Sequence, residues 1–465
     1  MALRLFNTLG REKQEFVPIG KKEVRMYSCG PTVYNYLHIG NLRSYVFADV
    51  LKRTLMYSGY KVKHIMNITD VGHLTSDADE GDDKMVKALK REGKPMTIAA
   101  MREIANTYYE KARIDMQKLE ILSADEYPFA TDHIKEMVAM IEVLLEKNAA
   151  YKTADSIYFD TKSIPDYGKL AKVKANDEHS RIGVNSEKKN LEDFALWKFA
   201  DAGGIGFEAS FGRGFPGWHI ECSAMAEKYL GVPFDIHTGG IDHIPVHHNN
   251  EIAQTEAATG KLLANYWLHN AHLTIGEEKM AKSGEFLTLS VLEKEGISPL
   301  AYRYWLLTAR YSTRMDYSLE AIKAAQTAYE KLVNFILSAQ KTTFWAKLKP
   351  KRLPSGFYRE KFLEAINDDL DTPKALALVW ELLKDGSLPD TDKKATLLDF
   401  DKVLGLGLAD IKKLEIPEEI QNLLDERKIA RNSKDWVKSD ELRKEIEKLG
   451  FAVKDSDSGS ELRPL

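Results

Sequence analysis

VRMYSCGPTVYNYLHIGN, residues 24–41, is the stretch from which a fold class follows most directly. Its first six residues have the short, largely apolar pattern of a buried strand, and Gly30-Pro31 ends that strand. Apolar residues then recur with helical spacing from about 44 to 55, and a second strand pattern covers 62–68. A strand, a helix and a strand in this order predict two parallel strands joined by a right-handed crossover.

The rest of the chain predicts an α/β protein of about three domains. Residues 234–237 have the pattern of a later strand of the same sheet, and helical periodicity covers 84–122 and 132–149. Beyond residue 290 the pattern is almost entirely helical, apart from a short strand or hairpin expected over 451–465. We therefore expect a Rossmann-like parallel-sheet domain with a mainly helical insertion, then an α-helical bundle, then a small α+β domain. The expected boundaries are 1–325 with the insertion at about 125–200, then 326–416, then 417–465.

The composition narrows the possible classes of protein. The formal net charge of the 465 residues is −4, so no basic field covers the whole chain and any RNA contact must be local. No run of about 18 apolar residues occurs, so no membrane span is expected. The first residues lack the apolar run of a signal peptide, and we expect a cytoplasmic protein. With only two cysteines, Cys29 and Cys222, free thiols or metal ligands are favoured over a disulfide.

Two short motifs carry groups that suit phosphate binding. His38-Ile39-Gly40-Asn41 follows the first strand and opens a helix, where a glycine lets ATP pack against the backbone and the helix N-terminus faces its phosphates. Lys279-Met280-Ala281-Lys282-Ser283 places two lysines on one short stretch, and lysine is a mobile point charge for a pyrophosphate. Each motif also has a plainer interpretation: the first is a helix-start turn capped by a histidine, and the second is a solvated loop.

A third group of residues has the chemistry of a zinc site. Cys29 ends the first strand, where ligands gather in an open α/β sheet, and Cys222 lies in the stretch 217–225. His247 and Glu251 are four residues apart, so they share one face of a helix. Two thiolates, an imidazole and a carboxylate form a set that zinc accepts. The alternative is two buried cysteines beside a polar helix face.

Taken together, these motifs resemble those of class I aminoacyl-tRNA synthetases. The two phosphate motifs are similar to the HIGH and KMSKS signatures of that class, with Asn41 in place of the last histidine and Ala281 in place of the first serine. Over nearly its whole length the chain resembles cysteinyl-tRNA synthetases, in particular in residues 29–34, 67–70, 217–225 and 234–254. Thr238, Val246 and Asn249 depart from the usual pattern of that family.

The resemblance implies an enzyme that activates L-cysteine with ATP and Mg²⁺ and transfers it to the 3′ end of tRNA(Cys), and we expect it to be a monomer. One Zn²⁺ per chain would recognise the cysteine thiolate, because a soft metal prefers a thiolate to a hydroxyl. The implied zinc ligands are Cys29, Cys222, His247 and Glu251, and the implied cysteine pocket is Gly30, Thr69, Trp218 and His237. The implied ATP-binding residues are Thr32, His38, Gly40, Asn41, Gly240, Asp242, Lys279 and Lys282, of which His38, Asn41, Lys279 and Lys282 are also the expected catalytic residues.

The last part of the chain is predicted to bind RNA. Residues 421–465 balance basic against acidic side chains, so attraction to phosphate alone does not identify an RNA site. The stretch 431–440 resembles the anticodon-contacting end of the same family. The implied anticodon residues mix stacking and base-edge groups, which suit unstacked bases, and are Arg431, Trp436, Asp440 and Asp455. An exposed amphipathic helix pair has the same composition and is the alternative.

Three other functions fit part of the pattern. A ligase that joins cysteine to an amino sugar would use the same zinc and adenylation residues, but the helical C-terminal part argues against it. A catalytically silent RNA-binding paralogue is disfavoured by the intact His38, Lys279 and Lys282. A zinc hydrolase is disfavoured because 247–251 reads HHNNE rather than HExxH.

Overall fold

The computed structural model describes residues 2–72, 83–172, 187–201, 205–276, 278–279, 287–339, 354–412, 417–456 and 459–464. They form two compact units, Met1–Ala409 and Asp410–Leu465. The division of the first unit into a catalytic domain and a bundle stays a prediction, and the expected boundary at 325 falls inside a helix, α9 (Leu319–Ser338).

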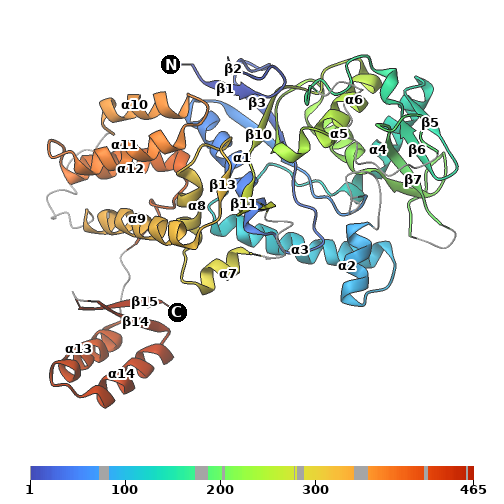
Figure 1. The fold of residues 1–465 in the computed structure, drawn as a ribbon. Helices are drawn as coiled ribbons and strands as arrows, with labels where there is room; N and C mark the ends of the chain where they lie inside the picture. Colours follow the sequence, from blue (N-terminus) through green and yellow to red (C-terminus); the bar gives the residue numbers. More distant parts are fainter. Residues whose placement is uncertain are drawn as a thin grey trace. The chain divides into compact units, whose positions relative to one another are not determined.

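A four-stranded sheet forms the centre of the first unit, with the order β10-β9-β3-β4 (Figure 1). All three pairings are parallel, so the predicted parallel sheet is confirmed. The crossover between β3 and β4 is α1, which begins at the predicted phosphate motif and packs on the sheet through buried residues such as Leu51. The bounds are β3 (Glu23–Ser28), α1 (Ile39–Tyr57), β4 (Lys61–Met66), β9 (Phe234–Gly240) and β10 (Ala264–Asn270).

The strand order creates a point where ligands can bind. The chain runs from β3 outward to β4 on one side, and later adds β9 and β10 on the other side, so the connections diverge between β3 and β9. In open α/β sheets the crevice beyond the carboxyl ends of such a strand pair is the usual ligand site. Here the two ends are joined directly, because the Cys29 amide donates to the Thr238 carbonyl at 3.1 Å.

Helices and a second sheet follow β4 in the chain. The helical pattern predicted over 84–122 is broken in the structure, because Gly93 takes a left-handed conformation (φ +63°) and a new helix is capped by Thr97. The insertion expected at about 125–200 contains a helix and the strands β5, β6 and β7. With β8, which follows the expected end of the insertion, these strands form an antiparallel sheet that was not predicted. The bounds are α2 (Lys84–Glu92), α3 (Ile98–Lys118), η1 (Ala130–His133), α4 (Ile134–Glu146), β5 (Ala150–Lys152), β6 (Ser156–Phe159), η2 (Thr161–Ser163), β7 (Phe194–Phe199) and β8 (Gly214–Pro216).

Two helices and several short strands complete the surroundings of the central sheet. Helix α5 contacts β3 and β4, and α6 packs on α5, which brings residues from distant parts of the chain beside the carboxyl ends of the strands. A separate three-stranded sheet has the order β12-β11-β13, and β1 and β2 form a hairpin. The bounds are α5 (Trp218–Leu230), η3 (Ile241–His243), α6 (His247–Thr259), β11 (Leu273–Ile275), β12 (Glu278–Lys279), β13 (Met315–Asp316), β1 (Arg4–Asn7) and β2 (Glu12–Glu15).

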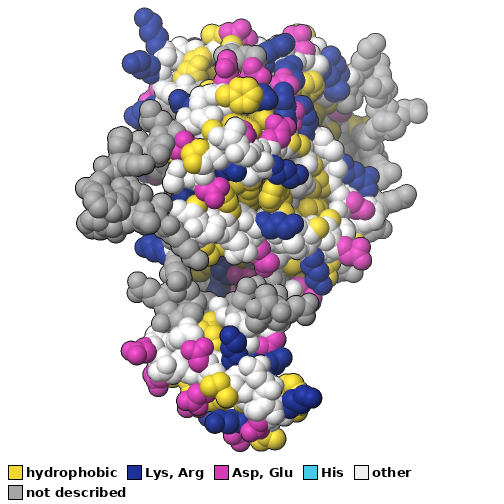
Figure 2. Space-filling model, turned by 90° about the vertical axis from the view of Figure 1, so that its left-hand side faces the viewer, with side chains coloured by type: hydrophobic (Ala, Val, Ile, Leu, Met, Phe, Trp, Pro, Cys, Tyr) yellow, Lys and Arg dark blue, Asp and Glu magenta, His cyan; other side chains and the backbone are white. Residues whose placement is uncertain are grey.

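The remainder of the first unit is helical, as predicted. In Figure 1 these helices lie on one side of the central sheet, and the α4–α6 region lies on the other. An ion pair of 2.5 Å between Arg303 and Asp49, both fully buried, ties this part of the chain to α1. Figure 2, which faces the helical side, shows basic and acidic side chains interspersed. The bounds are α7 (Leu289–Lys294), α8 (Pro299–Leu307), α9 (Leu319–Ser338), α10 (Gly356–Ile366), α11 (Thr372–Lys384) and α12 (Asp390–Leu404).

The second unit has a small core of its own. Buried Ile420, Ile446 and Val453 meet between two helices and a hairpin. The hairpin confirms the strand pair expected near the end of the chain. Across all of the described residues, no helix has both the length and the apolar character that crossing a membrane requires. The bounds are α13 (Glu418–Asn432), α14 (Trp436–Lys448), β14 (Phe451–Ser456) and β15 (Gly459–Pro464).

Candidate active site and metal centre

Four side chains from three elements converge at the carboxyl ends of β3 and β9. Cys29 follows β3 directly, Cys222 lies in α5, and His247 and Glu251 occupy the first turns of α6. One potential ligand atom from each lies within 4.8 Å of the others. Both cysteines are free thiols, and they lie close in space as predicted.

A second set of donors overlaps the first. Cys29 and Glu251 also lie within 4.8 Å of His237 and His248. His237 Nε2 donates to Glu251 Oε2 at 2.8 Å, and Cys29 Sγ lies 3.3 Å from His248 Nε2. His237 was predicted for the cysteine pocket, whereas His248 was not among the predicted site residues. The sequence feature that could have pointed to His248 is the adjacent pair His247-His248 at the start of α6. Only His247 stands four residues before Glu251.

Burial and mutual contact set the charge of the first group. Burial raises the pKa of the Cys222 thiol, but its hydrogen bond with Cys29 and the nearby His247 outweigh burial and lower the pKa to about 6. Burial and the Cys222 sulfur raise the pKa of Cys29 well above its usual range. Burial also acts against ionisation of Glu251, yet the imidazoles of His237 and His247 hold its pKa well below the usual range. These contacts favour the ionised forms of Cys222 and Glu251 over their protonated forms, in spite of burial.

The donors fit a zinc ion in both chemistry and hydrogen bonding. His247 Nδ1 shares a hydrogen bond with His219 Nδ1 at 2.9 Å, which leaves Nε2 to face the other donors. His247 Nε2 is buried 2.9 Å from Glu251 Oε1, and within the described residues it makes no hydrogen bond of good geometry. Burial lowers the pKa of His247, but Glu251 and Cys222 raise it to about 10, so the ring holds a proton that a metal would replace. The hydrogen bond between His219 and the Nδ1 atom of His247 would orient the ring, as a hydrogen bond at the other ring nitrogen commonly does in a metal-binding imidazole.

The residues predicted for the cysteine pocket surround this group. Trp218 stacks on His247 with ring centroids 4.1 Å apart, and His237 contacts Glu251 as described. Gly30 approaches β4 so closely that a Cβ there would lie 1.7 Å from the Asn67 carbonyl oxygen. Thr69 is buried and donates to Glu221 Oε2 at 3.0 Å. The structure thus brings Trp218 and His237 into contact with predicted zinc ligands. Gly30 follows Cys29 directly, and Thr69 contacts Glu221, the residue before Cys222.

The first phosphate motif caps α1. His38 Nδ1 accepts from the Asn41 amide and Asn41 Oδ1 accepts from the His38 amide, each at 3.2 Å. This arrangement matches the plainer interpretation of a capping histidine, and it also orients the ring beside the helix N-terminus, where anions bind. The backbone of Gly40 lies against that ring, because a Cβ there would be 3.0 Å from its atoms.

The other predicted ATP residues lie on three further segments. Thr32 bridges to Thr69 in parallel, next to β4. Gly240 ends β9, and a Cβ there would lie 2.4 Å from Asp242 Oδ1. The backbone of Lys279 belongs to β12, opposite Thr274 of β11. Lys282 lies outside the described residues.

The predicted anticodon residues lie in the second unit. Trp436 opens α14 and is 56% exposed, and the Arg431 guanidinium lies 5.8 Å from its ring centroid. Asp440 is exposed on the same helix. Asp455 pairs with buried Arg427 through two hydrogen bonds of 2.8 Å, and with Arg431 at 2.9 Å. Because of these bonds, the pKa of Asp455 lies well below its usual range.

Comparison with known proteins decides the family. Residues 15–327 match the model of the class I (C) tRNA synthetase catalytic domain, and 414–463 match the cysteinyl-tRNA ligase anticodon binding domain. A cysteine–tRNA ligase of Burkholderia lata is 45% identical over 99% of this chain and 97% of its own length. The chain belongs to the cysteine–tRNA ligase family. A second relative in this family, from Treponema denticola, is 41% identical over 98% of both chains.

More distant structures share the fold of this cysteine–tRNA ligase family member. A Mycobacterium tuberculosis methionyl-tRNA synthetase has a TM-score of 0.56 at 15% identity, covering 83% of this chain and 90% of its own. An Agrobacterium radiobacter leucyl-tRNA synthetase has a TM-score of 0.59 at 12% identity, with 85% of each chain covered. These likenesses confirm the class I fold.

The three departures from the pattern of the cysteine–tRNA ligase family have local partners in the structure. Thr238 Oγ1 shares a hydrogen bond of 2.7 Å with Ser28, between β9 and β3. Asn249 donates to the Ile244 and Pro245 carbonyls, and so it satisfies the turn before α6. Val246 stands at the N-cap of α6 without a side-chain hydrogen bond. Nothing in the structure explains the choice of valine there.

Proposed function

We propose that this chain activates L-cysteine with ATP and transfers it to tRNA(Cys). The proposal rests on two kinds of support, full-length similarity to cysteine–tRNA ligases and the cluster of thiol, imidazole and carboxylate donors between β3 and β9. In the first step the cysteine carboxylate attacks the α-phosphorus of ATP, and pyrophosphate leaves. In the second step the terminal ribose hydroxyl of the tRNA attacks the carbonyl carbon, and AMP leaves.

The first step needs ATP to be held at the end of the sheet with its phosphates near positive groups. The N-terminus of α1 supplies a helix dipole, and His38 and Asn41 supply hydrogen-bond donors there. Lys279 and Lys282 would place two positive charges on the β- and γ-phosphates as these leave. These groups assist the reaction to the extent that they bind the transition state better than ATP.

Cysteine would be recognised at the donor cluster. Cys29, Cys222, His247 and Glu251 would hold a zinc ion, which when bound supplies a soft Lewis acid that prefers a thiolate to a hydroxyl. Trp218 and His237 line the same place and would shape the pocket around a small side chain. Serine lacks the sulfur and would be rejected at this step.

The second unit would bind the anticodon. Its support is the match to an anticodon binding domain and the exposed Trp436 beside Arg431, since exposed aromatic rings stack on unpaired bases. A monomeric cytoplasmic enzyme that uses Mg²⁺-bound ATP is part of the same prediction.

Two assays test the proposal. Cysteine-dependent exchange between ATP and pyrophosphate measures the first step, and charging of tRNA measures both. We expect both activities, with discrimination against serine, and we expect Lys282→Ala to lower the maximal exchange rate rather than only the affinity for ATP. Exchange without charging of tRNA, together with transfer of cysteine to an amino sugar, would replace this function with the amino-sugar ligase. Absence of exchange would refute adenylation itself.

A further inference from the structure

A short hairpin carries the backbone of Lys279. Strand β11 pairs with β12 in antiparallel fashion, so that Thr274 stands opposite Lys279 and Ile275 opposite Glu278. On its other edge β11 pairs in parallel with β13, with Leu273 opposite Met315. The position of Lys279 therefore depends on how β11 is held.

Arg314 holds the tip of this hairpin from the side. Its Nη2 donates to the carbonyl of Gly276 at 2.8 Å, where the chain leaves β11 with φ +58°. Its Nε donates to Thr274 Oγ1 at 3.2 Å. The Thr274 hydroxyl in turn donates to Asp316 Oδ1 at 2.9 Å. The guanidinium thus bridges Gly276, just after the end of β11, and Thr274, the residue opposite Lys279. The Arg314 side chain is exposed, so it contributes little to the packing of the core.

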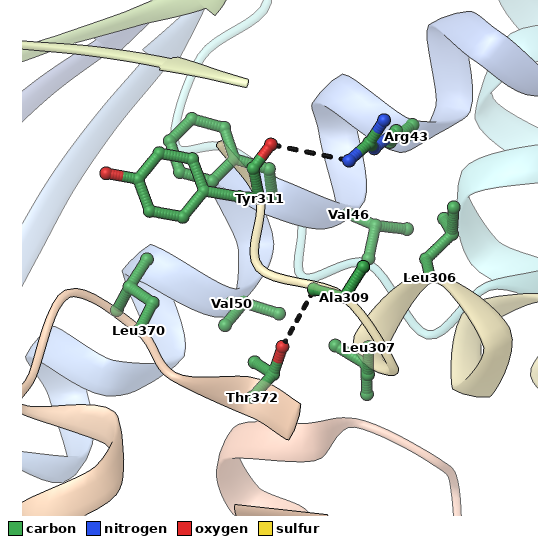
Figure 3. A pocket seen from close by; sticks show the side chains of 10 residues that line it. Arg43, Val46, Val50, Leu306, Leu307, Ala309, Tyr311, Leu370 and Thr372 are labelled. Carbon is green, nitrogen blue, oxygen red and sulfur yellow. Dashed lines mark hydrogen bonds between the residues drawn. The ribbon is translucent and has the colours of Figure 1, made fainter. Parts of the chain in front are cut away.

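The segment that bears Arg314 is anchored to the helix that opens with His38. Arg43, buried in α1, donates to the carbonyls of His272 (2.5 Å), Tyr311 (3.4 Å) and Thr313. Figure 3 shows Arg43 pointing at the Tyr311 carbonyl from one side of this segment, and Thr372 bonded to the Ala309 carbonyl from the other.

A continuous set of hydrogen bonds therefore connects α1 to the β11–β12 hairpin. It runs from α1 through Arg43 to the 311–313 backbone, and from there through Arg314 to β11 and β12. The first motif and Arg43 share one helix, and a helix is rigid over so short a distance. The two arginines therefore add side-chain bonds to the β11–β13 pairing that already holds this hairpin near α1.

We propose that Arg314 is a positioning residue for adenylation, which holds the β11–β12 hairpin, and with it the backbone of Lys279, in place relative to the N-terminus of α1. The inference rests on the proposed role of Lys279. Arg314 acts through the hairpin and does not touch the substrates. Its loss should leave the predicted cysteine pocket intact, because Gly30 and Thr69 follow β3 and β4, and Trp218 and His237 lie in α5 and β9.

Kinetics of the full-length enzyme test this role. Arg314→Met removes both donors, whereas Arg314→Gln retains an amide at the place of Nε and removes the charge. Arg113→Met, on α3, is a control for the loss of an exposed arginine, since Arg113 pairs with Glu110 and lies outside this hairpin. For Arg314→Met we expect the kcat of pyrophosphate exchange to fall about tenfold, with an unchanged KM for cysteine, because a lost positioning contact is felt in the transition state. We expect Arg314→Gln to recover part of that loss and the control to match the parent enzyme.

Each other outcome overturns the inference in a recognisable way. An unchanged kcat for Arg314→Met removes the positioning role. A raised KM for ATP with no recovery in Arg314→Gln assigns the arginine a direct charge contact with ATP instead. If Arg314→Met loses thermal stability and bound zinc together with activity, the arginine supports the fold as a whole and does not position the hairpin. If the parent enzyme itself shows no exchange, the proposed function fails, and that failure is seen before any variant is compared.

Discussion

Trp436→Ala should weaken tRNA charging without affecting cysteine activation. The ring is 56% exposed, so it contributes little to the core of the second unit, which is formed by Ile420, Ile446 and Val453. Its packing partner is the Arg431 guanidinium at 5.8 Å from the ring centroid, and an exposed cation–π contact of this kind is worth roughly 0.5–1 kcal/mol. The substitution should therefore leave the unit folded, with a small loss of stability at most.

The effect on RNA binding should be larger than the effect on folding. Removing a ring that stacks on one unpaired base costs about 1–3 kcal/mol. At 25 °C this range corresponds to a fall of roughly 5- to 150-fold in affinity, and a similar fall in kcat/KM for the tRNA. The values for cysteine and ATP in pyrophosphate exchange should not change, because every residue of the proposed active site lies in the first unit.

Val437→Ala provides the control, since Val437 is the next residue of α14 and is 72% exposed. The assay compares kcat/KM for tRNA in charging with kcat/KM for cysteine in exchange, for the parent and both variants. Circular dichroism and a thermal melt check the fold. Equal charging by Trp436→Ala and the parent would refute the stacking role, and an equal loss in Val437→Ala would show that the surface, not the ring, matters.

Three further predictions concern the metal, the domain division and pH. Cys222→Ser should lose zinc and exchange activity together, because it removes the donor whose pKa is lowered to about 6; full zinc occupancy measured by elemental analysis would exclude Cys222 as a ligand. Deleting Asp410–Leu465 should leave exchange largely intact and abolish most charging, and a truncated enzyme that charges tRNA normally would contradict the anticodon assignment. Burial raises the pKa of Asp115 to about 6, above its value in the unfolded chain. The folded state therefore binds the proton of this carboxyl more tightly than the unfolded state, and the stability of the fold falls as the pH rises through 6. Asp115→Asn should thus raise the melting temperature at pH 7.5 and have little effect near pH 4, and a pH-independent change would refute this.

Local patterns predicted much of the architecture. Strand and helix periodicity around residues 24–68 predicted the parallel pair β3–β4 and its crossover, because side-chain spacing reflects which face of an element is buried. The four-residue spacing of His247 and Glu251 predicted a shared helix face, and their donor atoms do meet. Periodicity did not predict the break at Gly93, since the apolar spacing continues on both sides of the left-handed turn.

Pairings between distant segments were beyond such patterns. Nothing local predicts that His248 would face Cys29, because the two belong to different elements and meet only through the packing of α6 on the end of the sheet. The same is true of Arg427, whose pairing with Asp455 depends on the hairpin folding back on α13. Asp455 was selected as one of a group of stacking and base-edge side chains, and no local pattern pointed to the arginine that pairs with it.

The element types, the two phosphate motifs and the kinds of donor available for a metal could thus be read from the chain, since these depend on local spacing and side-chain chemistry. Tertiary structure alone decided which donors share one site, what charge they carry and which side chains hold the Lys279 hairpin. The physical reason is that the pKa of Cys222 and the contacts of Arg314 depend on burial and on neighbours far away in the chain. Such neighbours exist only after the sheet and its covering helices have packed.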